Sequence, residues 1–165
     1  LNAIDLITNE KDRAENIMIV DLLRNDLNKV CEKESVAVSE LLKLESYPKV
    51  HHLTSVIRGK IKKDKTWLDL LKACWPGGSI TGAPKIRACK RIYEIEKFDR
   101  GPYCGSFIKI DWHGCLDSNI LIRSYILKNK KIKIHAGCGI VNDSIPKEED
   151  AELKWKILPL IESLK

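Results

Sequence analysis

The stretch PGGSITGAPK at residues 76–85 separates two segments that have helical patterns. Its Pro-Gly-Gly start ends the first pattern, and Pro84 is placed to begin the second, because proline suits the first turn of a helix. Two glycines enclose four residues, as in a phosphate-binding P-loop, but Ala83 stands where that motif has lysine and Lys85 comes two residues later. The stretch is therefore a damaged nucleotide site, a plain turn before a helix, or a loop that binds another anion.

Helical and strand-like patterns occur on both sides of this stretch. Thr66 is placed to cap a helix that runs through Trp75, with Asp69 at the capping-box position where Glu or Gln is usual. Apolar positions without an intervening glycine or proline predict one helix over residues 5–28. Further helices are expected from Pro84 to about Lys97 and from about Pro146 to about Leu164, and strands at 35–45, 50–61, 103–111, 115–128 and 131–137. This order predicts an α+β fold in which an antiparallel β-sheet packs with helices.

Length and composition indicate the class of protein. A chain of 165 residues with 44% hydrophobic residues suits one compact domain or one part of a larger one, so disorder is not expected. The chain starts at Leu1 rather than at methionine, and we expect residues 1–165 to be part of a longer protein. No apolar run approaches the roughly 18 residues that span a bilayer, and no signal-peptide pattern opens the chain. A cytoplasmic protein without a membrane partner is therefore expected.

Charge and cysteine content bear on the possible partners. The net charge of +6 is compatible with nucleic acid, an anionic membrane or an acidic substrate. The longest basic cluster, RGKIKKDK at 58–65, is short and has no aromatic residues between its lysines, so nucleic-acid binding is not expected. The six cysteines form no C-x-x-C pair and no zinc-like spacing with histidine, which predicts reduced thiols.

Acidic side chains three residues apart share a face on two of the predicted helices. Asp12 and Glu15 lie together on the first helix, and Glu149, Glu152 and Lys156 lie together on the last. If the two helices converge, their carboxylates suit a hard cation such as Mg²⁺, which prefers oxygen ligands in octahedral geometry. The alternative is that both are solvated faces, and the spacing alone is compatible with either.

Other polar or small residues stand at positions that suit either a ligand or the fold. Arg123 occupies the middle of the strand-like run LDSNILIRSYIL, where a buried charge needs a carboxylate from the protein or from a ligand. His51 and His52 are expected on opposite faces of a strand, where one is a candidate proton-transfer group and a structural role is the alternative. The small residues of HAGCGIV at 135–141 permit close approach of the backbone, which suits ligand binding or a bulge.

Seven stretches of the chain resemble, in the same order, the sequences of one enzyme family. They are AENIMIVDLLRNDL (14–27), VHHLTS (50–55), PGGSITGAPKIRA (76–88), RGPYCGS (100–106), LDSNILIRS (116–124), AGCGIVNDSIPKEED (136–150) and the helix after it. The family is the chorismate-utilising enzymes, which include aminodeoxychorismate, anthranilate, isochorismate and salicylate synthases, and the resemblance is to their C-terminal portion. The stretches cover nearly the whole chain. The resemblance implies part of a larger β-sandwich fold like that of anthranilate synthase component I.

The resemblance implies a role for each matching position. Glu15 and Glu149 are expected to hold Mg²⁺, with Asp12 and Glu152 supporting the ion through water. The family often has Glu where this chain has Asp12. His52 matches the catalytic histidine, a proton-transfer group near the reacting ring. The substrate-binding positions are Ser79, Ile80, Thr81, Tyr103, Arg123, Gly137, Gly139 and Lys156.

Two of the matching stretches resemble one branch of the family more than the others. PGGSITGAPK is similar to the loop of aminodeoxychorismate synthase component I, whereas anthranilate synthases usually carry a variant like AGTLSGAPK and often have VMHL in place of VHHL at 50–53. The implied reaction replaces the C4 hydroxyl of chorismate with an amino group and gives 4-amino-4-deoxychorismate for 4-aminobenzoate and folate. The alternatives are anthranilate synthase component I and a non-catalytic fragment or binding module.

The resemblance also implies groups that these residues do not supply. Ammonia is expected from a partner glutamine amidotransferase subunit, since no cysteine here lies in a nucleophile-elbow sequence. The aminodeoxychorismate branch has a nucleophilic lysine in a PIKGT-like motif, which is expected before Leu1. The stretch at 76–85 is expected to place a carboxylate rather than a phosphate, because Ala83 and Pro84 remove the lysine and the N–H groups of a phosphate cradle.

Overall fold

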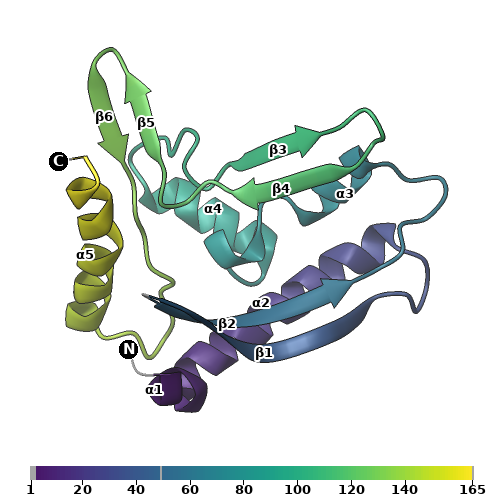
Figure 1. The fold of residues 1–165 in the computed structure, drawn as a ribbon, viewed down its shortest axis with the longest axis horizontal. Coiled ribbons are helices and arrows are strands. Elements are labelled where there is room, and N and C mark those ends of the chain that lie inside the picture. Colours follow the sequence, from purple (N-terminus) through teal and green to yellow (C-terminus); the bar gives the residue numbers. More distant parts are fainter. Residues whose placement is uncertain (1–2, 49, 165) are drawn as a thin grey trace. The chain divides into compact units, whose positions relative to one another are not determined.

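The computed structural model describes residues 3–48 and 50–164, and the chain forms two compact units, residues 1–89 and 90–165 (Figure 1). Both units contain helices, and the strands pair antiparallel with their neighbours in the sequence. The predicted α+β class is therefore confirmed, although the described strands form three separate hairpins. No helix among the described residues is long and apolar enough to cross a membrane.

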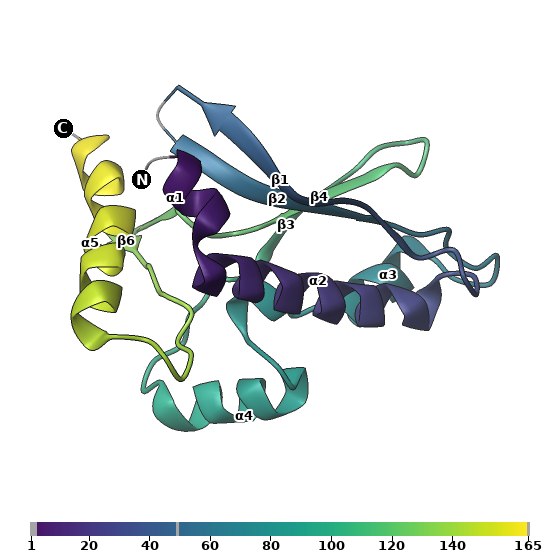
Figure 2. The same cartoon turned by 90° about the horizontal axis from the view of Figure 1, so that it is seen from below.

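The first unit is built on a long helix packed against a β-hairpin. Helix α2 (Glu10–Val30) contacts strand β2 (Val50–Arg58), which pairs antiparallel with β1 (Ala37–Tyr47). Figure 2 shows α2 running along the length of the hairpin. The apolar residues buried in this unit are Val20, Val30 and Cys31. They lie on α2 or directly after it, so the side of α2 that faces away from solvent forms the centre of the unit.

The helix predicted over residues 5–28 is in fact two helices. Helix α1 (Ala3–Thr8) ends before Asn9, whose extended backbone (φ −67°, ψ 109°) interrupts the helical path. The Asn9 side chain accepts a hydrogen bond from the Asp12 N–H at 3.1 Å, as is typical of an N-cap residue. The apolar pattern continues across Asn9, so periodicity alone does not reveal the break.

The segment around PGGSITGAPK (76–85) contains the two helices that were predicted on either side of it. Helix α3 (Trp67–Cys74) begins after Thr66, whose N–H and hydroxyl donate to the Asp69 carboxylate at 2.9 and 3.0 Å. A 3₁₀ turn, η1 (Gly78–Ile80), follows, and α4 (Lys85–Ile95) begins directly after a proline. The predicted capping box and the proline before the second helix are therefore confirmed.

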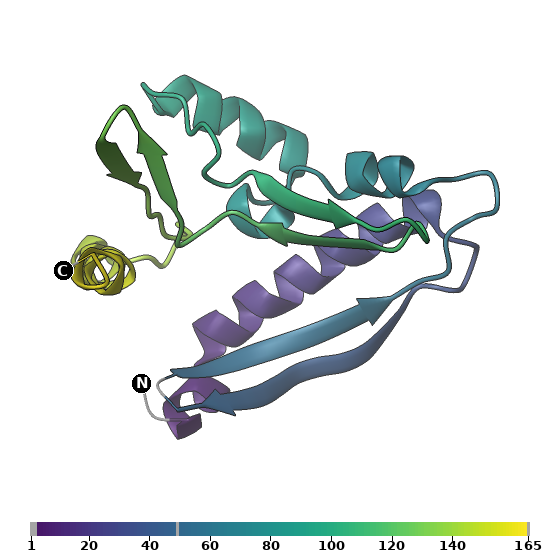
Figure 3. The same ribbon diagram turned by 45° about the horizontal axis from the view of Figure 1, so that its top comes forward.

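The second unit consists of two antiparallel hairpins and a long helix. Its elements are β3 (Ser106–Ile110), β4 (Leu116–Ile120), β5 (Tyr125–Lys128), β6 (Lys131–Ile134) and α5 (Pro146–Glu162). Strand β3 pairs with β4, and β5 pairs with β6. The Tyr125 hydroxyl donates to the Leu160 carbonyl at 2.7 Å, which ties β5 to α5. Figure 3 shows the ribbon of these elements from another side.

The strand predicted over residues 115–128 is interrupted. Residues 121–124 lie between β4 and β5, and Arg123 has a φ of 50°. A positive φ belongs to the left-handed region, which does not continue a β ladder. Arg123 is exposed at this bend rather than buried in a strand. The argument that a buried Arg123 needs a carboxylate partner was therefore wrong, and its proposed role depends on the family resemblance.

Candidate functional site

The beginning of α2 carries the first predicted acid pair. Asp12 lies in the first turn, and Glu15 lies three residues further along the same helix. Both side chains are half-buried. The N-terminal end of a helix dipole favours negative charge, so the fold tolerates carboxylates at this position.

A side-chain amide ties this part of α2 to the strand that carries His52. The Asn16 amide donates to the Leu53 carbonyl at 3.0 Å, and its oxygen accepts a hydrogen bond from the Ser55 hydroxyl at 2.7 Å. Asn16 follows Glu15 in the sequence, and Leu53 follows His52. These two hydrogen bonds therefore fix the segment with the acid pair against the segment with the histidine.

The adjacent histidines of β2 differ in exposure, as expected for neighbours on opposite faces of a strand. His52 is exposed and meets the ring of Tyr47 edge to face, with centroids 5.9 Å apart and 66° between the ring planes. His51 is half-buried, and its Nδ1 lies 2.9 Å from the Ser46 hydroxyl. Proton transfer with a ligand needs an accessible ring nitrogen, which favours His52 over His51.

The loop around η1 packs closely on α2. A Cβ on Gly78 would lie only 2.7 Å from Leu22 Cδ1, so glycine allows the loop to approach the helix. The Thr81 hydroxyl donates to the Gly77 carbonyl at 2.9 Å and closes the turn from within. Of the three predicted binding residues, Ser79 is exposed, and Ile80 and Thr81 are half-buried.

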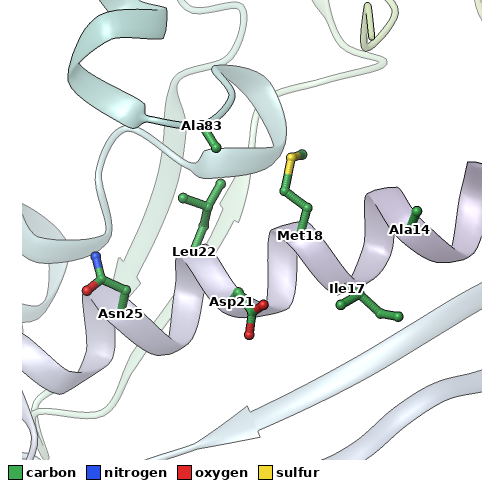
Figure 4. A pocket seen from close by; sticks show the side chains of 7 residues that line it. All are labelled: Ala14, Ile17, Met18, Asp21, Leu22, Asn25 and Ala83. Carbon is green, nitrogen blue, oxygen red and sulfur yellow. The ribbon is translucent and has the colours of Figure 1, made fainter. Parts of the chain in front are cut away.

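A mainly apolar pocket of about 600 Å³ lies along α2 beside this loop (Figure 4). Its lining consists of Ala14, Ile17, Met18, Asp21, Leu22, Asn25 and Ala83. Figure 4 shows Met18 and Leu22 pointing toward the segment that carries Ala83. The lining includes none of the residues predicted from the sequence. Two of its residues are close to them in the chain, since Ala14 precedes Glu15 and Ala83 follows the η1 turn.

In the second unit, aromatic and cationic neighbours hold Tyr103. Its ring stacks on His135 with centroids 5.4 Å apart, and the Arg100 guanidinium lies 5.9 Å from the ring centre. Arg100 also forms a bidentate pair with Glu96 at 2.6 and 2.8 Å, which lowers the pKa of that carboxyl. Burial, aided by the neighbouring Cys104 thiol, raises the pKa of Tyr103 to about 12. The phenol therefore stays protonated at neutral pH and can donate a hydrogen bond.

The backbone at Gly137 meets both Tyr103 and α5. A Cβ at this position would lie 2.9 Å from the Tyr103 hydroxyl oxygen, so a glycine is needed for this close approach. The Lys156 ammonium on α5 donates to the Gly137 carbonyl at 3.0 Å. The same ammonium forms an ion pair with Glu152 at 2.5 Å. Lys156 therefore contacts both Gly137 and Glu152, and the Tyr103 phenol lies next to Gly137.

Atoms suited to binding a metal ion gather at the same place. Glu149 is only 8% exposed, and its carboxylate, that of Glu152 and the Cys138 sulfur each offer an atom within 4.8 Å of the others. We call Gly137, Cys138, Glu149, Glu152 and Lys156 the α5 cluster. The two carboxylates fit Mg²⁺, whereas the sulfur suits softer metals. Cys138 has no metal-type spacing in the sequence, and its place between two glycines shortly before α5 is the feature that could have pointed to it.

Arg123 and Tyr103 lie near the same end of the β3–β4 hairpin. The N–H of Cys104, directly after Tyr103, donates to the Leu121 carbonyl at 2.9 Å, two residues before Arg123. Gly139 is exposed in the segment between β6 and α5. Among the described residues of the second unit, the contacts that define the α5 cluster involve neither Arg123 nor Gly139.

The predicted site residues are divided between the two units. Asp12, Glu15, His52, Ser79, Ile80 and Thr81 belong to the first unit, and Tyr103, Arg123, Gly137, Gly139, Glu149, Glu152 and Lys156 belong to the second. Within the second unit, the structure brings a carboxylate pair, an ammonium and a phenol together. That the acid pairs of α2 and α5 share one metal ion stays a prediction.

Comparison with known proteins identifies the family. A profile of the chorismate binding enzymes matches residues 2–162. The chain belongs to this family. Aminodeoxychorismate synthase component 1 of Escherichia coli is 44% identical over 98% of the chain and 36% of that protein. Anthranilate synthase component 1 of Acetivibrio thermocellus is 42% identical over 97% of the chain and 32% of that protein.

A solved structure of this family supports the fold as well. Anthranilate synthase component I from Streptococcus pneumoniae matches 96% of the chain with a TM-score of 0.89 and 44% identity, and the match covers 36% of that protein. The predicted family and the chorismate-binding fold are therefore confirmed. The chain spans about a third of the length of these relatives. Its assignment to the C-terminal portion of a catalytic domain and the roles of single residues stay predictions.

Proposed function

We propose that the chain binds chorismate together with Mg²⁺, as part of an enzyme that replaces the C4 hydroxyl of chorismate with an amino group. The observation that carries this proposal is the α5 cluster with the adjacent Tyr103 phenol. A buried carboxylate, a second carboxylate and an ammonium lie beside an exposed glycine backbone. Such a cluster offers ligands for a divalent cation and donors for a substrate carboxylate, and the family is defined by chorismate binding.

Side chains from both units would act on the substrate. The Tyr103 phenol and the Lys156 ammonium would donate to one carboxylate, with the backbone N–H groups around Gly137 and Gly139 assisting. The exposed Arg123 guanidinium would pair with a carboxylate through two parallel hydrogen bonds. The accessible ring of His52 would move a proton near the reacting carbon. Ser79, Ile80 and Thr81 would lie next to the ring of the bound substrate.

The carboxylates of the two helices would hold the metal ion. Glu149 and Glu15 would bind Mg²⁺ directly, and Glu152 and Asp12 would support it through water. When bound, the ion would neutralise the carboxylate of the substrate and hold it in place. The donor chemistry of the α5 cluster supports this assignment, since Mg²⁺ is usually bound through one or two protein carboxylates and several waters.

The sequence of the loop at residues 76–85 supports 4-amino-4-deoxychorismate as the product. Identities of 44% to an aminodeoxychorismate synthase and 42% to an anthranilate synthase are too similar to separate the two branches. The PGGSITGAPK loop and the VHHL sequence instead resemble the first branch. The ammonia would come from a glutamine amidotransferase partner, and a nucleophilic lysine would come from another part of the protein.

Product analysis tests this proposal. The protein that carries this chain is incubated with chorismate, ammonium and Mg²⁺, and the products are separated by chromatography and identified by mass. We expect aminodeoxychorismate, with a rate that falls in His52→Ala and is retained in His51→Ala. Anthranilate as the sole product would contradict the proposed branch. Absence of both products, together with absence of Mg²⁺-dependent chorismate binding, would contradict the proposed function.

A further inference from the structure

Lys85, the lysine that stands two residues beyond the P-loop position, is held inside the first unit. Its ammonium forms an ion pair with Asp26 of α2 and donates to the Cys74 carbonyl at 3.3 Å. The side chains of Lys85 and Asp26 are only 16% and 4% exposed. A charge withdrawn this far from water needs a charged partner, so this lysine is used internally rather than for a phosphate ligand.

The contacts of Lys85 join the two ends of the loop. Cys74 is the last residue of α3 and Lys85 is the first residue of α4. The ammonium that bridges them therefore closes the chain around residues 75–84. Asp26 fixes the same ammonium to α2, which also carries Glu15. The Lys85 side chain thus links both ends of the loop to α2.

The buried Lys85–Asp26 ion pair is expected to affect the conformation of the loop more than the free energy of unfolding. Desolvation offsets much of the Coulomb attraction in a buried ion pair, so replacing both partners with apolar residues is often neutral for stability. Lys29 also donates to Asp26, at 2.8 Å, but it belongs to α2 itself and its side chain is 54% exposed. Removal of Lys29 therefore tests the loss of a charge near Asp26 without unfastening the loop.

We propose that Lys85 is a positioning residue: paired with Asp26, it holds residues 75–84 in one conformation so that Ser79, Ile80 and Thr81 meet the substrate in a fixed arrangement. The inference rests on the proposed function, because the substrate that meets this loop is the chorismate proposed above. It adds a residue that makes no contact with the substrate but determines how strongly the loop binds it.

Amide hydrogen exchange tests, without any ligand, whether Lys85 holds residues 75–84 in one conformation against α2. The N–H groups of residues 80–82 donate within the loop. In Lys85→Met, and in Asp26→Leu/Lys85→Met, which leaves no buried unpaired charge because Lys29 is 54% exposed, we expect these amides to exchange about tenfold faster than in the wild type. Lys29→Met is the matched control and is expected to exchange like the wild type. Unchanged exchange of the loop in both Lys85 variants would overturn the proposal.

Chorismate binding separates this inference from the proposed function. In calorimetry with Mg²⁺, we expect Lys85→Met to bind chorismate about tenfold more weakly, Lys85→Arg to recover part of the affinity, and Lys29→Met to match the wild type. Faster loop exchange with unchanged affinity in Lys85→Met would overturn the positioning role. A wild-type chain that binds no chorismate would overturn both the proposed function and this positioning role. Faster amide exchange in the Lys85 variants would in that case still support the attachment of the loop to α2 by Lys85.

Discussion

The two units hold their predicted site residues by different means. In the first unit, Glu15 and His52 stand on a helix and a strand, and the Asn16 amide joins these elements through hydrogen bonds to the strand. In the second unit, Tyr103 and Gly137 stand on irregular segments and are placed by ring stacking and by one close backbone approach. We therefore expect loss of the Asn16 amide, which is not among the proposed binding groups, to affect chorismate binding less than a change at Gly137 does.

The largest effect is expected from removing the buried carboxylate of the α5 cluster. Glu149→Ala should weaken Mg²⁺-dependent chorismate binding by more than about 100-fold, since loss of a metal ligand costs at least as much as loss of an outer partner. Calorimetry with and without Mg²⁺ measures the change. Glu148→Ala is the matched control, because Glu148 is exposed in the same helical turn. An equal loss of chorismate affinity in Glu149→Ala and Glu148→Ala would show that the charge of the helix, rather than metal binding by Glu149, determines the affinity.

A smaller effect is expected from adding one methyl group at Gly137. The new Cβ would lie 2.9 Å from the Tyr103 hydroxyl, and such overpacking costs about 1–3 kcal/mol. If about 1.4 kcal/mol of this cost falls on the bound state, the affinity drops about tenfold. Gly137→Ala should therefore displace the phenol and weaken chorismate binding. Tyr103→Phe removes the clashing oxygen, so the double variant should bind as Tyr103→Phe does alone. A double variant that shows the full sum of both losses would contradict the contact.

In the first unit, loss of the Asn16 amide should affect stability more than binding. Asn16→Ala leaves the Leu53 carbonyl and the Ser55 hydroxyl without this partner, which we expect to lower the free energy of unfolding by about 1 kcal/mol. Urea unfolding measures the change. Asn28→Ala, at an exposed position of the same helix, is the control. A tenfold loss of chorismate affinity in Asn16→Ala would remove the contrast between the units.

The smallest effect is expected at the start of α3. Hydrogen bonds from the Thr66 N–H and hydroxyl lower the pKa of Asp69. A carboxyl whose pKa is lower in the folded state stabilises the fold above the unfolded pKa, and this stability is lost as the pH falls below about 4. Asp69 is half-buried and its hydrogen bonds to Thr66 lie at the surface, so the effect should be slight. Unfolding followed from pH 7 to pH 3 should show a flatter acid dependence for Asp69→Asn, and a dependence equal to that of the wild type would count against the cap.

Local sequence signals predicted the elements whose ends depend on neighbouring residues. Thr66 and Pro84 precede helices as expected, because capping and proline geometry act over one turn. The breaks at Asn9 and Arg123 were not predicted, since each depends on the backbone angles of one residue while the apolar pattern continues across it. A pattern of apolar positions shows which side of an element is buried, but it does not show whether the element is continuous.

Long-range contacts account for most of what the sequence did not reveal about the site. Asn16 and Leu53 are 37 residues apart, and Asp26 and Lys85 are 59 residues apart. No local spacing predicts such pairs, because the fold alone brings them together. The acidic residues of α2 and α5 were found as candidates because carboxylates three residues apart are visible in the sequence.

Titration of chorismate into the chain, in Mg²⁺ and in EDTA, most directly tests whether the molecule binds this substrate through a divalent cation. We expect saturable binding in Mg²⁺ that weakens by about 100-fold or more in EDTA, to the level of Glu149→Ala in Mg²⁺. Equal affinity in Mg²⁺ and in EDTA would contradict the metal site, and absence of binding in both would contradict chorismate as the ligand.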